Sequence, residues 1–538
     1  MENERTTPRS EAQDELKELR SDIQYRGRSR LARVLTAAHD GLRGYVCQVE
    51  VCLMQGLPYF DLVGSSDKTL REAPDRIKAA LRMSGYKFPD TRIVVNLSPA
   101  WLAKRGSSFD LPIALGILLA SGQLVTKREI RAFGELALDG SVKPVPGAYI
   151  LAQSLTEAPG VHCLVPFENY KETNYFGENR MLPAASLRDA CRRLAGSDDV
   201  FTEGVPALSL LPAESEDTPD LSILKGQGLA VEALQVCAAG GHHMMVYGSA
   251  GCGKTTLASC LAGILPDLDP VSQREIAAIY SVAGRLVDSE MNFAKAPFRS
   301  PHFSTTQQAL FGGGPFPRPG EVSLAHRGVL FLDELTAFPS QTLTRLLVPL
   351  EHGHVEIARL KQTVTFPAEF QLLAAANPCP CGKLLDGGCR CPQGDIERYR
   401  RKVIGPFRDR IDLQISMLRV PQSLLSRTVQ TDDTLMSPSA KARIIEARNH
   451  QRARHQEAGL GAILNSHVPG ERLADIWEIS PQVLRYSEAI AARLDLSVRG
   501  FQKVLRVART IADLEQRRYI RREDLDLSVH FRSQQEDK

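Results

Sequence analysis

The organisation of this chain follows from one short segment, Gly248-Ser249-Ala250-Gly251-Cys252-Gly253-Lys254-Thr255. The segment matches G-x-x-x-x-G-K-[ST], a pattern that binds phosphate groups. The residues before it, His243 to Tyr247, predict a short buried strand, and Thr256 to Ala262 predict the helix that follows. Glycines let the backbone N–H groups turn inward around phosphates, and the helix N-terminus adds a partial positive charge. The order strand, loop and helix therefore predicts a nucleotide site here.

Each part of this predicted site has a chemical role. Lys254 reaches the β- and γ-phosphates as a point charge, and the hydroxyl of Thr255 is placed for Mg²⁺. A second apolar strand, Gly328 to Leu332, delivers Asp333 and Glu334 at its carboxyl end. We expect Asp333 to hold the Mg²⁺ shell and Glu334 to activate the attacking water. The predicted nucleotide-binding set is Gly248, Ser249, Ala250, Gly251, Cys252, Gly253, Lys254, Thr255, Thr256 and Asp333.

Three later positions complete a predicted hydrolytic site. The strand Phe370 to Ala376 ends at Asn377, whose amide fits a sensor for the lytic water or the γ-phosphate. Arg410, in the segment Phe407 to Leu413, suits an arginine finger that neutralises transition-state charge from a neighbouring subunit. Arg499 opens a helix and is predicted to be a second phosphate sensor. A surface ion pair is the alternative for either arginine.

Length and composition describe an ordinary globular protein of several domains. The chain has 538 residues, of which 43% are hydrophobic and 24% are charged, and its net charge is only +3. No global field therefore indicates a nucleic-acid partner, so any such contact must come from local basic patches. No apolar run is long enough for a membrane span, and Met1 to Arg20 lacks the apolar core of a signal peptide. We expect a cytoplasmic protein with no membrane partner.

Composition and periodicity divide the chain into five predicted parts. These are a charged tail (1–28), an α/β region (29–195), a linker rich in Pro, Ser and acids (196–220), a second α/β region (221–420) and a helical region (421–538). The first α/β region predicts strands at 46–54 and 92–97, helices at 70–85 and 111–121, and a hairpin at 133–142. The helical region predicts helices at 439–457, 482–493, 501–514 and 522–529.

The motifs taken together resemble an AAA+ ATPase of the magnesium-chelatase-like branch, and more narrowly the ComM/YifB family. The segments that bear the resemblance, besides those above, are Ser300-Pro301-His302-Phe303-Ser304, Gly312-Gly313-Gly314-Pro315, residues 319–328, Asn377-Pro378-Cys379-Pro380-Cys381-Gly382 and residues 507–514. The resemblance covers about residues 29 to 530. It implies an AAA+ core with a C-terminal helical lid, bound ATP and Mg²⁺, and hexameric rings that drive branch migration of DNA during recombination of incoming strands. It also implies that the 312–320 loop faces the central pore.

The same resemblance assigns residues 29–195 to a domain like the proteolytic domain of Lon, with a ribosomal-protein-S5-like fold. The matching segments are Gly106 to Pro112 and Gly134 to Gly140, and Ser108 lies near the serine position. The segment that should supply the lysine base, Pro146 to Leu151, has none. A serine without an adjacent base is a poor nucleophile at neutral pH. We therefore predict a non-proteolytic interaction domain.

Two features predict additional ligands. Of 11 cysteines, Cys379, Cys381, Cys389 and Cys391 form C-x-C…C-x-C, which suits tetrahedral Zn²⁺; four reduced thiols are the alternative. The other seven are scattered in apolar surroundings, which indicates a reducing compartment. Residues 354–366 predict a β-hairpin with a basic tip at Arg359 and Lys361 that contacts DNA, or else a solvated turn. The basic run 398–402 is open to the same two interpretations.

Three functions from different classes fit this pattern. The first, which we favour, is a DNA motor: a homo-oligomeric ring that remodels single-stranded or branched DNA with ATP, as in natural transformation. The second is a chelatase-type ATPase subunit that remodels a protein partner. The third is an ATP-dependent protease, which the missing lysine disfavours.

Overall fold

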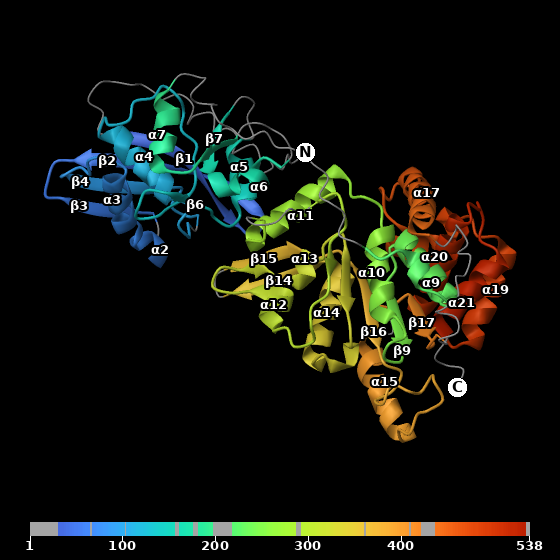
Figure 1. The fold of residues 1–538 in the computed structure, drawn as a ribbon. Helices are drawn as coiled ribbons and strands as arrows, with labels where there is room; N and C mark the ends of the chain where they lie inside the picture. Colours follow the sequence, from blue (N-terminus) through green and yellow to red (C-terminus); the bar gives the residue numbers. More distant parts are fainter. Residues whose placement is uncertain are drawn as a thin grey trace, which may run out of the picture. The chain divides into compact units, whose positions relative to one another are not determined.

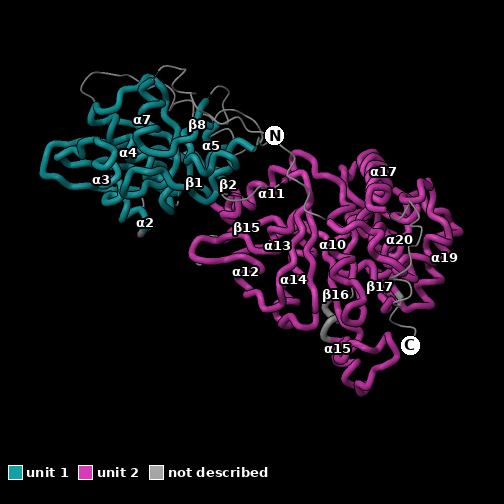
Figure 2. The backbone as a smooth tube through the Cα atoms, viewed as in Figure 1, with its two compact units in different colours: residues 1–39, 43–209 teal, residues 40–42, 210–538 magenta. Residues whose placement is uncertain are grey.

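The computed structural model describes residues 31–64, 67–102, 104–156, 161–175, 181–196, 218–286, 292–359, 362–407, 410–420 and 436–533. The chain forms two compact units (Figure 2): residues 1–39 with 43–209, and residues 40–42 with 210–538. The predicted charged tail, 1–28, and most of the predicted linker, 197–217, lie outside the described residues.

Unit 1 is built on a four-stranded sheet. Its strands, in spatial order, are β1 (Leu31–Asp40), β2 (Arg43–Met54), β4 (Arg92–Ser98) and β3 (Tyr59–Val63). β2 pairs antiparallel with β4, and β3 pairs parallel with β4. Burial alternates along β4, because successive side chains of a strand point to opposite faces. The strands predicted at 46–54 and 92–97 are confirmed as β2 and β4.

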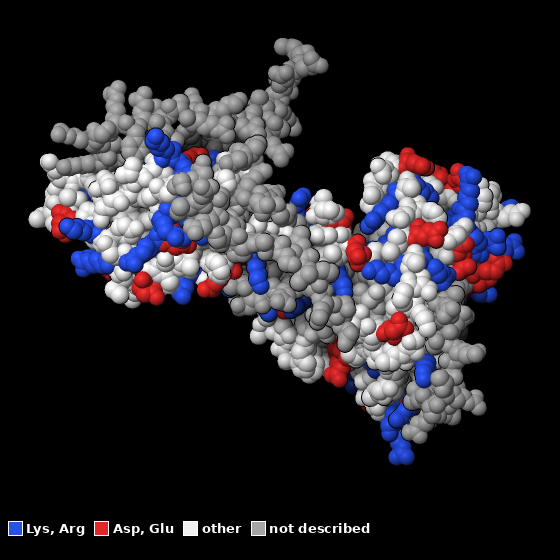
Figure 3. Space-filling model, turned by 45° about the horizontal axis from the view of Figure 1, so that its top comes forward, with Lys and Arg blue, Asp and Glu red and all other residues white. Residues whose placement is uncertain are grey.

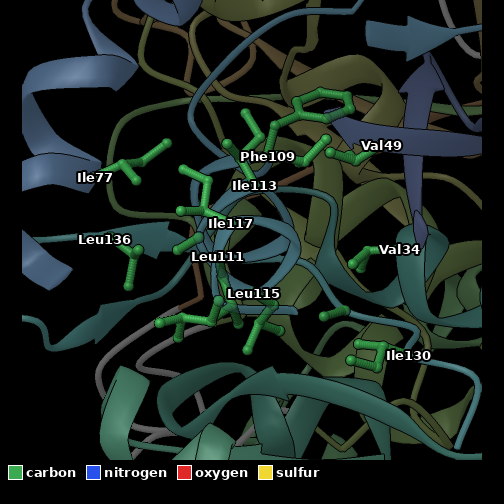
Figure 4. Packing of buried hydrophobic residues seen from close by; sticks show 14 of the residues in the cluster. Val34, Val49, Ile77, Phe109, Leu111, Ile113, Leu115, Ile117, Ile130 and Leu136 are labelled. Atoms are coloured by element: carbon green, nitrogen blue, oxygen red, sulfur yellow. The ribbon is translucent and has the colours of Figure 1, made fainter. Parts of the chain in front are cut away.

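One apolar helix fills the core of unit 1. α4 (Asp110–Ala120) is buried from Asp110 to Leu118, and it packs against β2 (Figure 4). A helix that is apolar all round is stable only when it is covered on every side. Its first residue, Asp110, accepts two hydrogen bonds from Arg76 of α3 (Ala73–Met83), at 2.8 and 3.0 Å. Burial nevertheless raises the pKa of Asp110 to about 6.

Shorter elements complete unit 1. The hairpin predicted at 133–142 is confirmed as the antiparallel pair β5 (Glu135–Leu136) and β6 (Val142–Lys143), and the helix predicted at 70–85 is found as two pieces. The remaining elements are α2 (Lys68–Arg71), α5 (Ala148–Leu155), β7 (Cys163–Pro166), α6 (Tyr170–Thr173), β8 (Met181–Ala184) and α7 (Leu187–Ala195).

Unit 2 contains a five-stranded sheet whose neighbouring strands are all parallel. In spatial order its strands are β10 (Phe298–Arg299), β13 (Val329–Leu332), β16 (Gln371–Ala376), β9 (Met244–Gly248) and β17 (Leu413–Met417). β9, which leads into the phosphate-binding segment, lies between β16 and β17 (Figure 1). The carboxyl ends of β9, β16 and β13 therefore meet at one edge of the sheet, and the predicted α/β class is confirmed for this unit.

Helices and two-stranded hairpins flank this sheet. The helices are α9 (Gly228–Gly240), α10 (Lys254–Ile264), α11 (Pro270–Ala283), α12 (Gln307–Phe311), α13 (Glu321–Leu324), α14 (Ser340–His352) and α15 (Gln393–Phe407). The antiparallel hairpins are β11 (Gly312–Gly313) with β12 (Arg318–Pro319), and β14 (His354–Arg359) with β15 (Gln362–Pro367). The hairpin predicted at 354–366 is confirmed by the second pair.

Residues 436–533 are largely helical, and the four helices that the sequence predicts here are confirmed, whereas the short helix Leu473–Ile476 was not predicted. The helices are α17 (Ser437–Glu457), α18 (Leu473–Ile476), α19 (Pro481–Arg493), α20 (Val498–Leu514) and α21 (Arg522–Ser533). α20 packs against α9, α17 and α21. Along the described residues, no helix combines the length and the apolar character that crossing a bilayer requires.

A buried polar cluster joins this helical region to the sheet. Asp412, just before β17, accepts a hydrogen bond from Lys503 of α20 at 2.7 Å and another from the backbone N–H of His243 at 2.9 Å. The cationic ammonium lowers the pKa of Asp412 well below its usual range, against the opposing effect of burial. Burial lowers the pKa of His243 to about 4, so this imidazole is neutral at pH 7. Its Nδ1 accepts the N–H of Leu372, at 3.0 Å.

The packing of α4 generates a stability prediction. Ile117→Ala should lower the free energy of unfolding of unit 1 by about 2–5 kcal/mol, because it leaves a cavity in a fully buried site. Hydrogen exchange of α4 peptides in increasing urea measures the effect. Val125→Ala, at a side chain that is 64% exposed, is the control and should change stability by less than about 0.5 kcal/mol. Equal behaviour of the two variants would contradict the assignment of α4 as the core of this unit.

Candidate nucleotide site

The phosphate-binding segment adopts a conformation that only glycine reaches without strain at two positions. Gly251 and Gly253 have φ values of 78° and 98°. Gly248 is constrained differently, because a Cβ atom there would lie 2.4 Å from the Sγ atom of Cys252. α10 begins at Lys254, within the segment, so its free N–H groups and the positive end of its dipole face the glycine-rich loop. This arrangement suits a polyphosphate.

The structure brings four of the predicted side chains together. Lys254 Nζ lies 3.3 Å from Oδ1 of Asn377 and donates to the carbonyl oxygens of Gly248 and Ser249, at 2.7 and 3.1 Å. The hydroxyl of Thr255 donates to Asp333 Oδ2 at 2.9 Å. Residues that are far apart in sequence meet here because β9, β16 and β13 are neighbours with the same direction.

The oxygens of Thr255 and Asp333 are suited to a magnesium ion. Mg²⁺ prefers hard oxygen ligands and keeps several waters, and one carboxylate beside one hydroxyl is a common protein contribution. Asp333 also accepts a hydrogen bond from the backbone N–H of Glu334, at 2.8 Å, which fixes the orientation of its carboxylate. The residues present therefore fit the ion that the sequence predicts.

Glu334 occupies an unusual backbone position. Its φ is 48°, in the left-handed region, where a residue with a Cβ is uncommon and costs energy to hold. The turn ends β13 sharply, and the carboxylate of Glu334 is exposed beside Asp333. An exposed carboxylate beside Asp333 is available to accept a proton from water.

The two predicted arginines are not at this edge of the sheet. Arg410 precedes β17, whose first residue, Leu413, pairs with Met244 at the start of β9, whereas Met417 pairs with Gly248. The strand from Leu413 to Met417 spans about 13 Å. Arg410 therefore lies at the amino edge of the sheet, away from the phosphate segment of its own chain.

At the amino edge both arginines contact one carboxylate. Arg410 donates to Oε1 of Glu351, at the end of α14, and Arg499 Nη1 lies 3.8 Å from the same oxygen. Lys503 also donates to the backbone carbonyl of Arg410, at 2.7 Å. Sequence reasoning missed Glu351 and Lys503, because neither belongs to a motif. Glu351 lies near the end of α14, a helix that was not predicted from the sequence.

The four clustered cysteines are arranged as a metal site. Their sulfur atoms all lie within 4.8 Å of one another, with Cys379–Cys381, Cys381–Cys389 and Cys389–Cys379 separations of 3.4, 3.7 and 3.6 Å. Four sulfurs around one ion at a zinc–sulfur distance of about 2.3 Å lie about 3.8 Å apart. A backbone N–H of Lys383 lowers the pKa of Cys381 to about 6, which favours the thiolate that a metal requires. The cluster could hold a metal ion.

The cysteine loop connects to the phosphate site on both sides. Cys379 follows Asn377 by two residues, and Cys391 precedes α15 by two. On α15, the hydroxyl of Tyr399 is hydrogen-bonded to Oγ1 of Thr336, at 3.0 Å. Thr336 follows Glu334 by two residues. Burial raises the pKa of Tyr399, so this hydroxyl is protonated at neutral pH. Sequence reasoning missed this contact, which depends on the packing of α15 against the turn after β13.

Two predicted positions cannot be placed. The backbone of Arg359 ends β14, but its side chain and all of Lys361 lie outside the described residues.

In unit 1, Ser108 is half-buried, just before the start of α4. In the lysine-free segment, 146–151, Tyr149 is buried and its hydroxyl accepts a hydrogen bond from Gln153 at 2.5 Å. The segment therefore offers no lysine that could act as a base for Ser108.

Comparison with known proteins identifies the family. Family models match residues 220–425 ("Magnesium chelatase, subunit ChlI"), 49–169 ("Subunit ChlI of Mg-chelatase") and 435–532 ("Magnesium chelatase, subunit ChlI C-terminal"). The protein YifB of Salmonella typhimurium is 38% identical over 511 residues, which cover 94% of this chain and 97% of YifB. The chain belongs to the ComM/YifB family of magnesium-chelatase-like proteins.

Other relatives differ in how much of this chain they match. Competence protein ComM of Haemophilus influenzae is 36% identical over 511 residues, covering 94% of this chain and 97% of ComM. The magnesium-chelatase subunit ChlI of Cyanidium caldarium is 28% identical over 156 residues, which cover only 25% of this chain. Membership of the ComM/YifB family supports an ATPase that uses ATP and Mg²⁺.

Different side chains of the site are assigned to nucleotide binding and to hydrolysis, so substitutions should affect the two separately. Lys254→Ala should weaken binding of a fluorescent ATP analogue about 100-fold, because charge-assisted hydrogen bonds contribute about 1.5–3 kcal/mol each. Glu334→Gln should bind the analogue like the parent but release no phosphate, since the amide cannot accept the proton of water. Fluorescence titration and phosphate release measure the two effects. A Glu334→Gln protein that turns over like the parent would remove Glu334 from its predicted role.

Proposed function

We propose that this protein is a ring-shaped ATPase, hexameric in its working form, that moves or remodels single-stranded or branched DNA. ATP is hydrolysed between adjacent copies of the chain. The observation that supports this most is the position of Arg410, which lies at the amino edge of the sheet and away from Lys254 of its own chain. An arginine finger placed there can act only on the nucleotide of a neighbour.

The residues of the site divide the reaction among them. Lys254 and the N-terminus of α10 hold the phosphates, and Asn377 orients the water or the γ-phosphate. Glu334 takes the proton of the attacking water. Thr255 and Asp333 would hold Mg²⁺, which would supply positive charge to offset the charge on the phosphates.

The neighbouring copy supplies the remaining positive charge. Arg410 and Arg499 lie together beside Glu351, so both would face the nucleotide of the next chain in a ring. An arginine finger contributes about 10³–10⁵ in turnover in other nucleotide hydrolases. Hydrolysis therefore depends on assembly, which couples the chemistry to movement of the subunits.

DNA as the substrate is supported by membership of the family and by the form of two hairpins. The relative in Haemophilus influenzae is named a competence protein. β14–β15, which is labelled in Figure 1, and β11–β12 are both antiparallel hairpins. In the proposed ring, both hairpins would line a central pore. The Figure 3 view also shows Lys and Arg side chains gathered at the end of the unit formed by α15, where Arg398 and Arg401 are exposed. Phosphate contacts by such residues provide affinity without sequence preference.

A chelatase-type subunit that remodels a protein partner is the second candidate. The family models that match are those of a magnesium chelatase subunit, and this favours the general ATPase architecture. The chelatase subunit named above matches only a quarter of the chain, whereas ComM matches almost all of it. We therefore place this alternative second.

We also assign the four-cysteine cluster to structural Zn²⁺. Tetrathiolate coordination is typical of structural zinc, and the sulfur separations suit it. Bound there, the ion would fix the loop between the strand of Asn377 and α15. Mg²⁺ is not the expected ion in the cysteine cluster, because it prefers oxygen ligands to thiolates.

An ATPase and strand-migration experiment tests the proposal. The parent protein should hydrolyse ATP faster when forked or single-stranded DNA is added, and should displace a labelled strand from a junction. Arg410→Ala should assemble and bind nucleotide but hydrolyse it about 10³-fold more slowly, because the neighbour's charge is lost. Insensitivity of the parent to every DNA tested, together with stimulation by a protein fraction, would favour the chelatase-type alternative. Hydrolysis by Arg410→Ala at the parent rate would contradict the finger assignment.

Metal analysis tests the zinc assignment separately. Purified protein should contain close to one zinc per chain, and the Cys381→Ser/Cys389→Ser variant should contain almost none. Cys52→Ser, at a half-buried cysteine outside the cluster, is the matched control and should keep its zinc. A parent protein that is free of zinc when it is purified without chelators would contradict the assignment.

A further inference from the structure

Glu351 is the shared partner of the two arginines that the proposed function places at the subunit boundary. Its Oε1 atom accepts a hydrogen bond from Arg410 and lies 3.8 Å from Arg499. The side chains of Arg410, Glu351 and Arg499 are 22%, 37% and 64% exposed. The group is therefore open to another molecule and is not a buried structural pair.

The backbone around Arg410 is fixed independently of Glu351. Lys503 donates to the carbonyl of Arg410 at 2.7 Å, and Arg532 Nη1 donates to the carbonyl of Ile411 at 3.2 Å. Both donors come from the C-terminal helices, α20 and α21. What remains to be set is the direction of the Arg410 side chain. Among the described residues, Glu351 is the hydrogen-bond partner of the Arg410 side chain, and the Nε atom of Arg410 has no hydrogen-bond partner. Glu351 therefore sets the direction of this side chain.

The negative charge of Glu351 lies between two positively charged side chains. Two guanidinium groups that approach one point repel each other, and a carboxylate between them offsets that repulsion. A guanidinium also presents fixed donors in a plane, so its usefulness to a phosphate depends on its orientation. Glu351 supplies an anionic oxygen at the point where both side chains converge, as a phosphate oxygen would.

We propose that Glu351 is a positioning residue that holds Arg410 and Arg499 together as one receptor for the γ-phosphate bound to a neighbouring copy of this chain. Glu351 does not touch the nucleotide of its own chain, since it lies at the amino edge of the sheet with Arg410. The inference rests on the proposed hydrolysis between adjacent copies, and it adds a residue that no motif indicates. Loss of the carboxylate charge lets the arginines separate, and the receptor is then misaligned in the transition state.

Glu351→Gln tests this directly. The variant should keep the parent's melting temperature, oligomeric state and affinity for a fluorescent ATP analogue, while its kcat falls about tenfold or more, because small misplacement of a catalytic group is costly. Glu515→Gln is the matched control: it breaks another exposed Arg–Glu pair, with Arg443 at 2.9 Å, and should leave kcat unchanged. Glu351→Asp retains the charge on a shorter side chain and should recover part of the lost kcat.

A mixing experiment shows in which direction Glu351 acts. Glu334→Gln copies have an intact arginine receptor, and Glu351→Gln copies have an intact hydrolytic site. Mixed assemblies should therefore hydrolyse ATP several-fold faster per Glu351→Gln chain than assemblies of Glu351→Gln alone. The inference is overturned if Glu351→Gln has the parent's kcat, if it loses affinity for the analogue, or if mixing restores nothing. If instead the parent hydrolyses ATP as a monomer, the proposed function fails and not this inference alone.

Discussion

The parallel register of β9, β16 and β13 is the constraint on which the nucleotide site depends. A part of the site follows each strand directly: the phosphate segment follows β9, Asn377 follows β16 and Asp333 follows β13. Because the strands are neighbours and run in one direction, these ends converge, and the contacts of Lys254 with Asn377 and of Thr255 with Asp333 follow. A shift of register in any of the three would separate them.

The same parallel sheet separates the arginines from the phosphates of their own chain. A residue that precedes β17 must lie at the amino edge, so Arg410 and the carboxylate of Glu351 form a second charged group one strand length away. The buried pair of Asp412 and Lys503 ties this edge to α20, whose first turn bears Arg499. The proposed ring would bring the two charged groups, which lie on opposite edges of one sheet, together from adjacent copies of the chain.

Much of this arrangement could be predicted from sequence, because motifs at strand ends combine local chemistry with a fixed position in the fold. The phosphate segment, the strands before Asp333 and Asn377, and the hairpin at 354–366 are of this kind, and the elements were found where they were predicted. Contacts between elements could not be predicted in the same way. Glu351 and Tyr399 lie on amphipathic helices whose partners are known only from packing. The convergence of four sulfurs required the loop geometry as well as the spacing.

The central claim is that hydrolysis needs two copies of the chain, and turnover per chain as a function of protein concentration tests it most directly. Phosphate release and single-particle mass should be measured on the same samples, with nucleotide and DNA held in excess. The account predicts that turnover per chain is near zero for the monomer and rises steeply over the concentrations at which oligomers form. A turnover per chain that stays constant as the oligomers dissociate into monomers would contradict it.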